Sequence, residues 1–193
     1  NNKSISNIYG AFDINIRNNE INDKGEKYIM LAFNTAEMLI NKDNNQNYNS
    51  ENNQTFLSET TLIKHMQNND LFLRPYMVSS CKYDMLMGTN NTRTPLRYDI
   101  CNRHYLYVTE GSIKIKLTPP CNTKYLYREN DYEMLEFRSN INVWEPQEEY
   151  MKNFNKVKFL EFEVNEGTMV YIPPYWWYSI KYSPEKTNTV LSF

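Results

Sequence analysis

Short segments with the composition of β-strands fill the chain from residue 71 to its end, and they constrain the fold more than any other feature. Each is rich in Val, Ile, Tyr, Phe and Thr, and Gly, Pro or Asn separates it from the next. Thr109-Glu110-Gly111-Ser112 has the composition of a tight turn between two of them. Short strands separated by turns at intervals of about eight to twelve residues predict a mainly β protein, either an antiparallel sandwich or a barrel. The segments are MVSSCKYDMLMG (77–88), TPLRYDIC (94–101), HYLYVTEGSIKIKLTPP (104–120), VKFLEFEV (157–164), GTMVYIPP (167–174), WYSIKYS (177–183) and TNTVLSF (187–193).

The remaining segments carry weaker patterns, and none of them divides the chain. We predict one structural domain, in which residues 1–70 form an N-terminal elaboration and residues 71–193 the core. The expected elements are a strand at 8–16, an amphipathic helix at 26–42, a mobile Asn-rich loop at 41–54, a short helix at 58–69 with Ser58 as N-cap, and a long irregular insertion at 122–155 with a helix around PQEEYMKNF (146–154).

Charge and hydropathy narrow the classes of partner. The formal net charge is −2 and the pI is about 5.8, which gives no electrostatic reason to expect nucleic acid or an anionic membrane. No run reaches the roughly 18 apolar residues of a membrane span. The three cysteines, Cys81, Cys101 and Cys121, lie too far apart for a zinc knuckle, and we expect free thiols in a reducing, cytoplasmic compartment.

Two stretches of the strand-rich region carry motifs that belong together. TPLRYDICNRHYLYVTEGSIKIKLTPP (94–120) contains Thr-Pro, a hairpin and a Leu-x-Pro-Pro ending, and GTMVYIPPYWWYSIKYS (167–183) contains Ile-Pro-Pro-Tyr-Trp-Trp after a Gly-x-x-x-Tyr strand. In their order and in their residues, these motifs resemble those of the JmjC-type cupins, especially the group that includes the asparaginyl hydroxylase acting on hypoxia-inducible factor. The resemblance covers roughly residues 71–193 and implies a double-stranded β-helix, the cupin or jelly-roll fold.

The same resemblance implies a chemistry. The family holds Fe(II) with two histidines and one carboxylate and uses 2-oxoglutarate as co-substrate. A facial triad of this kind leaves three coordination positions open for the co-substrate and oxygen. A lysine or arginine in the barrel anchors the distal carboxylate of 2-oxoglutarate.

The ligand positions implied by the resemblance are mostly substituted in this chain. Arg97 stands at the first histidine position, Tyr178 stands at the last one after Trp176-Trp177, and Asp99 alone matches its position. A guanidinium stays protonated and has no lone pair for a metal. We therefore predict that Arg97, Asp99 and Tyr178 close a vestigial metal pocket as a hydrogen-bonded network, with no metal and no cofactor.

The co-substrate anchor is replaced as well. Counting from Gly111 along the family's Gly-x-Lys pattern leads to Ile113, while Lys114 and Lys116 fall on the opposite strand face unless a bulge shifts Lys114. Thr94 keeps a position that touches the co-substrate in the family.

Trp176 and the two histidines of the chain can be interpreted as structural residues. Trp176 either lines a ligand or packs as a core or rim aromatic. His104 follows Asp99 by five residues, and the alternation of a continuous strand predicts that it faces away from Asp99. His65, in the predicted short helix, is expected to be structural.

We expect a cupin that has lost iron and oxygenase activity and that serves a structural or protein-binding role, alone as a homo-oligomer or with other proteins. The frequent Asn, Lys, Tyr and Ile are typical of an AT-rich genome, such as that of a large DNA virus, and point to a capsid- or virion-associated component. Two alternatives stay open: an active Fe(II)/2-oxoglutarate hydroxylase with atypical ligands, and a carboxylate-binding cupin that uses Arg97 as a clamp.

Overall fold

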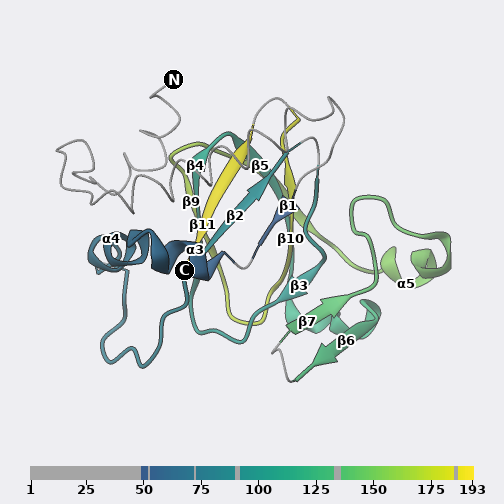
Figure 1. The fold of residues 1–193 in the computed structure, drawn as a ribbon. Helices are drawn as coiled ribbons and strands as arrows, with labels where there is room; N and C mark the ends of the chain where they lie inside the picture. The colour runs from purple at the N-terminus through teal and green to yellow at the C-terminus, as the bar shows by residue number, and fades with distance from the viewer. Residues whose placement is uncertain (1–48, 52, 72, 90–91, 133–135, 185–186) are drawn as a thin grey trace.

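Two antiparallel β-sheets face each other and enclose the core in the computed structural model of the chain (Figure 1). The structure describes residues 49–51, 53–71, 73–89, 92–132, 136–184 and 187–193. The five-stranded sheet contains, in spatial order, β1 (Asn49–Ser50), β2 (Asp84–Gly88), β11 (Asn188–Ser192), β4 (His104–Glu110) and β9 (Met169–Ile172). The six-stranded sheet contains β6 (Arg128–Asp131), β7 (Glu136–Ser139), β3 (Arg97–Tyr98), β10 (Trp177–Tyr182), β5 (Ser112–Thr118) and β8 (Leu160–Asn165).

The predicted turn between β4 and β5 is confirmed, and its glycine is required. Gly111 has a φ of 79°, a conformation that disfavours a side chain. A Cβ there would also lie 2.3 Å from Asn188 Oδ1. That oxygen accepts a hydrogen bond from the backbone N–H of Ser112 at 2.9 Å, so the turn is tied to the start of β11.

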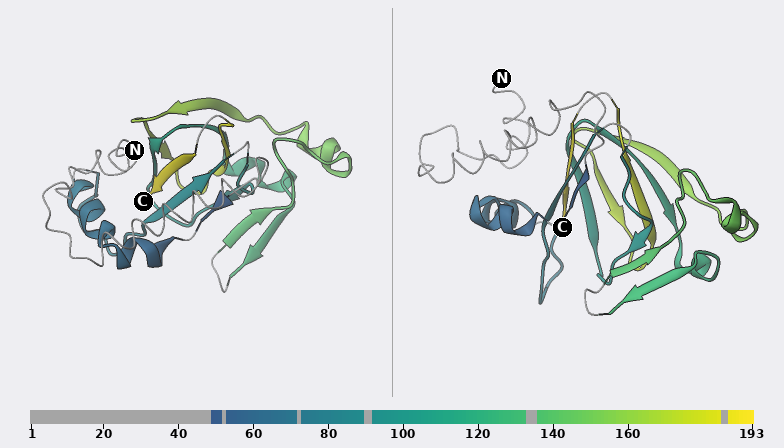
Figure 2. Two further views of the ribbon diagram at one scale, coloured as in Figure 1. Left: turned by 45° about the horizontal axis from the view of Figure 1, so that its top comes forward. Right: turned by 45° about the vertical axis from the view of Figure 1, so that its right-hand side comes forward.

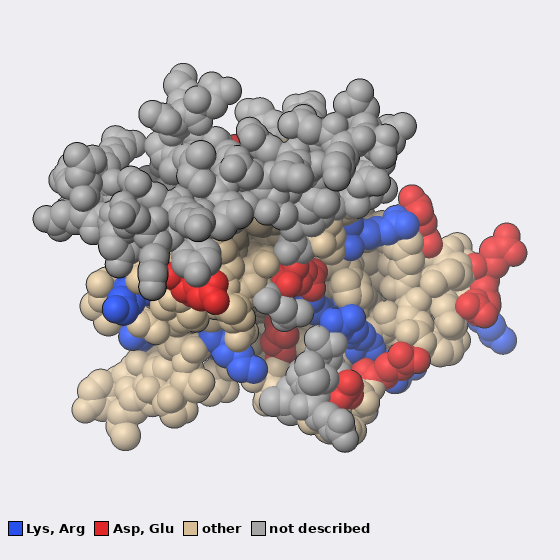
Figure 3. Space-filling view, in the orientation of Figure 1, with Lys and Arg blue, Asp and Glu red and all other residues tan. Residues whose placement is uncertain are grey.

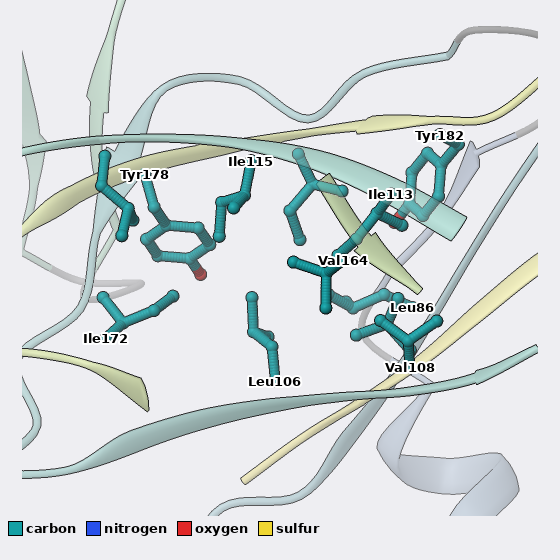
Figure 4. Packing of buried hydrophobic residues seen from close by; sticks show 12 residues of the cluster. Leu86, Leu106, Val108, Ile113, Ile115, Val164, Ile172, Tyr178 and Tyr182 are labelled. Carbon is teal, nitrogen blue, oxygen red and sulfur yellow. The ribbon is translucent and has the colours of Figure 1, made fainter. Parts of the chain in front are cut away.

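The core lies between the sheets and follows the two-residue alternation of the strands. On β10, Tyr178, Ile180 and Tyr182 point inward, where Figure 4 shows Tyr178 and Tyr182 at opposite ends of the cluster. Strands of both sheets supply aliphatic side chains that are almost fully buried. They include Leu86, Leu106, Val108, Ile113, Ile115, Leu117, Val164, Ile172 and Val190.

Two short helices cover the outer face of the five-stranded sheet, on the side of the molecule opposite the β6–β7 hairpin (Figure 2). The prediction of a single helix at 58–69 is wrong in detail, because the structure has two separate helices, α3 (Gln54–Glu59) and α4 (Leu62–Asn69). Ser58 is not an N-cap; it lies inside α3, where its hydroxyl donates to the carbonyl of Gln54 at 2.9 Å. Leu57 and Met66 bury their side chains against the sheet.

The segment 122–155 is more regular than the sequence indicates. It contains the β6–β7 hairpin, which extends the six-stranded sheet beyond β3. The helix predicted around 146–154 is confirmed as η3 (Glu148–Tyr150) followed by α5 (Met151–Phe154). A further 3-10 turn, η2 (Pro120–Tyr125), follows β5.

Other expectations need correction or fall outside the description. The strand predicted at 77–88 is limited to β2, so residues 77–83 form a connection, and the strand at 94–101 is limited to the two residues of β3. Within the loop predicted at 41–54, Asn49 and Ser50 pair with β2 instead. The strand predicted at 8–16 and the helix predicted at 26–42 lie outside the described residues.

The surface charges and the cysteines do little to narrow the function of the protein. On the face shown in Figure 3, acidic and basic side chains of the described residues are interspersed. In the described part of the chain, no helix has both the length and the apolar character needed to cross a membrane. All three cysteines are free, as predicted.

Candidate functional site

Arg97, Asp99 and Tyr178 meet at one end of the barrel interior. Arg97 lies in β3 directly opposite Tyr178 of β10, and Asp99 follows β3. The guanidinium Nε donates to the Tyr178 hydroxyl at 3.1 Å, and that hydroxyl donates to Asp99 Oδ2 at 2.8 Å. The guanidinium carbon lies 5.5 Å from the centre of the Tyr178 ring. The three side chains therefore form one hydrogen-bonded chain.

Glu51 is a fourth member of this cluster. Its carboxylate forms an ion pair with Nη1 of Arg97, and the two side chains are only 13% and 15% exposed. The backbone around Glu51 is held at the sheet edge, where Ser50 pairs with Met87 and the Asn53 N–H donates to Asp84 Oδ1 at 2.6 Å. Glu51 lies 46 residues before Arg97 in a polar segment, so no local pattern indicated its role.

The ionisation states of the cluster follow from burial and neighbouring charges. Burial raises the pKa of Tyr178 well above its usual range, and the Asp99 carboxylate adds to this rise, so the phenol stays protonated. Burial opposes the charge on Arg97, but the negative charges of Glu51 and Asp99 outweigh it, and the pKa of the guanidinium is raised. The end of the barrel interior formed by Arg97, Asp99, Tyr178 and Glu51, called the mouth from here on, thus holds one fixed cation beside two carboxylates.

His104 also belongs to the site, and the prediction that it faces away from Asp99 is wrong. His104 Nδ1 lies 3.2 Å from Asp99 Oδ2, and the imidazole packs edge-on against the Tyr178 ring at 5.2 Å between centres. Strand alternation does not apply, because the chain leaves the six-stranded sheet after β3 and enters the other sheet at His104. The second ring nitrogen, Nε2, lies 2.9 Å from Ser192 Oγ.

A cavity of about 810 Å³ opens onto these groups. Arg97, Asp99, His104, Tyr178 and Ser192 line its inner part. The connection between α4 and β2 and the residues after Asp99 form its outer wall, with Leu73, Tyr76, Met77, Val78, Ile100 and Arg103 among them.

The chain belongs to a family that its fold already indicates. A family profile described as "Cupin-like domain" matches residues 9–193. This chain is a member of the cupin-like domain family. The predicted jelly-roll cupin fold is confirmed, and the family match includes most of the residues before the strand-rich region.

Curated relatives contain JmjC domains. "JmjC domain-containing protein D" of Dictyostelium discoideum is 30% identical over 95 residues, which cover 49% of this chain and 21% of that protein. "Jumonji C domain-containing protein 5" of Drosophila melanogaster is also 30% identical over 95 residues, covering 49% of this chain and 23% of that protein. The match therefore spans less than a quarter of either relative.

Among solved structures, the Drosophila melanogaster CENP-C cupin domain aligns with a TM-score of 0.36 and 10% identity. The alignment covers 62% of this chain and 63% of that one.

The residues of this cupin-like domain do not fit a resident Fe(II). Arg97 has no lone pair to offer, and the Tyr178 phenol is protonated and donates to Asp99. Both nitrogens of His104 lie within hydrogen-bond distance of other side chains. Among the residues that the structure describes, no three His, Cys, Asp or Glu side chains converge as a metal-binding group. A His₂-carboxylate site cannot form from this donor set.

The residues that the resemblance places near the co-substrate pack in the barrel or bond to its strands. The Thr94 hydroxyl accepts from the backbone N–H of Ile180 at 2.9 Å, and the Thr94 N–H donates to the carbonyl of Ile180 at 2.8 Å. Ile113 is 1% exposed and packs in the aliphatic core. Trp176 is half-buried and packs against the same core cluster. None of the three lines the cavity.

The two lysines after Gly111 point away from the interior, as the alternation predicts. Lys114 is exposed, and β5 pairs with β10 without a register shift, so no bulge turns it inward. Lys116 lies on the outer face, where its Nζ donates to the carbonyl of Val143 at 3.0 Å and sits over the Trp144 ring. The described barrel interior thus has no lysine to anchor a dicarboxylate.

Proposed function

We propose that this cupin-like domain has no Fe(II)/2-oxoglutarate oxygenase activity and serves a structural or protein-binding role. The observation that supports this most strongly is the chain from Arg97 through Tyr178 to Asp99 at the family's ligand positions. Arg97, which cannot ligate a metal, donates a hydrogen bond to Tyr178, and the Tyr178 hydroxyl in turn donates to Asp99.

The buried ion pair of Arg97 with Glu51 argues against the carboxylate-binding alternative. An external acid would have to displace Glu51 from Arg97 and leave a carboxylate that is 13% exposed without its cation. Removing one partner from a buried pair costs about 3–5 kcal/mol. Arg97 is therefore a poor clamp for a free small acid.

Exposed apolar side chains favour contacts with other proteins. The connection between α4 and β2 leaves Tyr76 95% exposed and Met77 85% exposed, with Leu71 nearby in sequence at 63%. Apolar side chains gathered on one loop mark interaction sites more often than single exposed ones do. We propose this loop as the contact for a protein partner or a second copy.

The setting of the domain is part of the proposal. The Asn-, Lys- and Tyr-rich composition fits an AT-rich viral genome. A cupin without oxygenase chemistry is suited to assembly, in the cytoplasm or in a virion.

The loss of oxygenase activity is tested by metal loading. Purified protein is incubated anaerobically with Fe(II), desalted and analysed for metal, and 2-oxoglutarate turnover is then followed in air. We expect substoichiometric iron and no turnover above a protein-free control. Stoichiometric iron with turnover that Asp99→Ala abolishes would support the active-hydroxylase alternative.

The protein-binding role is tested separately. Quantitative affinity purification compares the wild type with a Tyr76→Ser/Met77→Ser variant, both shown to be folded by circular dichroism. We expect a defined set of proteins to be lost with the variant. Equal recovery from both would contradict a contact through this loop.

A further inference from the structure

Ser192, His104 and Asp99 lie in a row across the inner end of the cavity, with a hydrogen bond between Ser192 and His104 and a close contact between His104 and Asp99. Ser192 Oγ lies 2.9 Å from His104 Nε2, and His104 Nδ1 lies 3.2 Å from Asp99 Oδ2. The hydroxyl and the carboxylate thus contact opposite nitrogens of one imidazole. A nucleophile, a base and a group that orients the base occupy these same relative positions in serine hydrolases, on unrelated folds and in different chain orders.

The network assigns the tautomer of His104. Asp99 Oδ2 already accepts from the Tyr178 hydroxyl at 2.8 Å and can only accept again from Nδ1–H. Nε2 is then the nitrogen with the lone pair, and the Ser192 hydroxyl donates to it. Burial lowers the pKa of His104, which favours the neutral imidazole with a free lone pair on Nε2.

Two β-strands hold the pair rigidly. Ser192 ends β11 and His104 begins β4, and these strands pair antiparallel, with Ser192 opposite Leu106. Ser192 lies on the same face of the strand as Val190, whose side chain packs in the core. His104 is 6% exposed, whereas Ser192 is half-buried and lines the cavity. The hydroxyl is therefore open to a molecule in the cavity while the base is shielded.

We propose that Ser192 is a nucleophile for carboxylic esters, with His104 as its general base and Asp99 as the residue that positions His104. Ser192 Oγ forms a bond to the carbonyl carbon of the ester, and His104 Nε2 takes the hydroxyl proton. The bond from that carbon to the alcohol oxygen breaks, and His104 returns the proton to the leaving alkoxide. Water then attacks the acyl-serine by the same proton path, which releases the acid and restores Ser192.

The cavity defines the class of ester. Its wall combines aromatic and aliphatic side chains with five cations, Arg74, Lys82, Arg97, Arg103 and Arg138, so the cavity favours the oxygen anion formed during attack. A volume of about 810 Å³ accommodates a small acyl group on a compact alcohol. This chemistry uses no metal and does not rest on the proposed protein-binding role.

A fluorophosphonate probe tests the nucleophile directly. An activated serine displaces fluoride from phosphorus and keeps the phosphonyl group, which adds a defined mass to one peptide. We expect one phosphonyl group per chain, mapped by mass spectrometry to Ser192, in the wild type and in Ser80→Ala. Ser80 lines the same cavity but is exposed, so it is the matched control serine. Labelling of a different residue, or no labelling, would overturn the proposal.

The base and its positioning residue are tested with p-nitrophenyl acetate. We expect His104→Gln to lower kcat at least about 100-fold, the size of a general-base contribution. Asp99→Asn should lower kcat while KM stays unchanged, because Asp99 acts on His104 and not on the ester. A purely structural hydrogen bond would leave the wild type no faster than Ser192→Ala, and this result would refute the assignment. The peptide map of the labelled wild type decides the question even where a variant does not fold.

Discussion

The two ends of the barrel interior differ in chemistry although the same strand, β10, runs through both. At the mouth, Tyr178 joins Arg97, Asp99 and His104 in a network of hydrogen bonds and charges. Two and four residues further along β10, Ile180 and Tyr182 pack among aliphatic side chains such as Ile113. Figure 4 shows this apolar packing around both tyrosine rings.

The difference separates the part of the barrel that stabilises the fold from the part that holds the charges. The apolar end stabilises the fold through burial, and Ile113, which the resemblance places at the co-substrate anchor, adds to this core. The mouth holds charges that are stable only as a set, because each of them would be costly to bury alone. A substitution that removes one charge at the mouth should therefore be tolerated only if its partner is removed as well. A substitution at the apolar end changes stability through the side-chain volume that it removes.

The largest effect is expected from breaking the charge set at the mouth. Arg97→Leu leaves the Glu51 carboxylate without its cation and should lower the free energy of unfolding by about 3–5 kcal/mol in urea denaturation. The double variant Arg97→Leu/Glu51→Leu should recover most of that loss. If the double variant is as unstable as the single one, the two side chains are not coupled.

A slightly smaller loss is expected from the apolar end. Ile180→Ala creates a cavity where the side chain is fully buried, and should cost about 2–4 kcal/mol. No second substitution of a charged group should rescue it. Recovery in an Ile180→Ala variant that also lacks Arg97 would contradict the separation of the two ends.

Tyr178→Phe removes only the hydroxyl that links Arg97 to Asp99. The ring keeps its packing, and we expect a loss of about 1–2 kcal/mol in the same urea measurement. Tyr182→Phe is the control on the same strand: Glu51 and Arg97 also influence the pKa of Tyr182, but its buried hydroxyl has no hydrogen-bond partner in the structure. A cost for Tyr182→Phe as large as that for Tyr178→Phe would show that the network at the mouth adds nothing.

The mouth should also make stability depend on pH. The charged and titratable groups around His104 are Asp99, Arg97 and Tyr178, and burial lowers the pKa of His104 below 6.5. The unfolded chain then binds a proton at a higher pH than the folded one, so this contribution is complete above pH 6.5 and declines as the pH falls below it. Urea denaturation between pH 7.5 and 5.5 should show the decline in the wild type and a smaller one in His104→Gln. An equal decline in both would assign it to other groups.

The smallest effect is expected outside the barrel. Lys114→Ala changes an exposed side chain and should alter stability by less than about 0.5 kcal/mol. A larger loss would mean that Lys114 has a role in the interior, contrary to its outward position.

The sequence predicted the parts of this account that local patterns encode. Alternation placed Ile113 inward and Lys114 outward, because a strand fixes side-chain direction every two residues. The resemblance to the JmjC-type cupins, and not a local pattern, indicated that Arg97, Asp99 and Tyr178 form one cluster.

The rest depends on contacts that no local pattern contains. Glu51 reaches Arg97 only because Asn49 and Ser50 pair with β2, and a polar segment gives no sign of such pairing. His104 meets Asp99 because the chain changes sheets between them, which alternation along one strand cannot represent. Ser192 completes the row from the far end of the chain.

The most direct test of the central claim is an anaerobic calorimetric titration of Fe(II) into the wild type and into Arg97→His/Tyr178→His. The substitution Glu51→Gln is added only to the Arg97→His/Tyr178→His protein, so that no unpaired carboxylate is left when Arg97 is replaced. We predict no saturable binding in the wild type, and one equivalent of tightly bound Fe(II) in the protein with the three substitutions. Stoichiometric binding with Arg97 and Tyr178 present would contradict the claim that these two residues have closed the metal site.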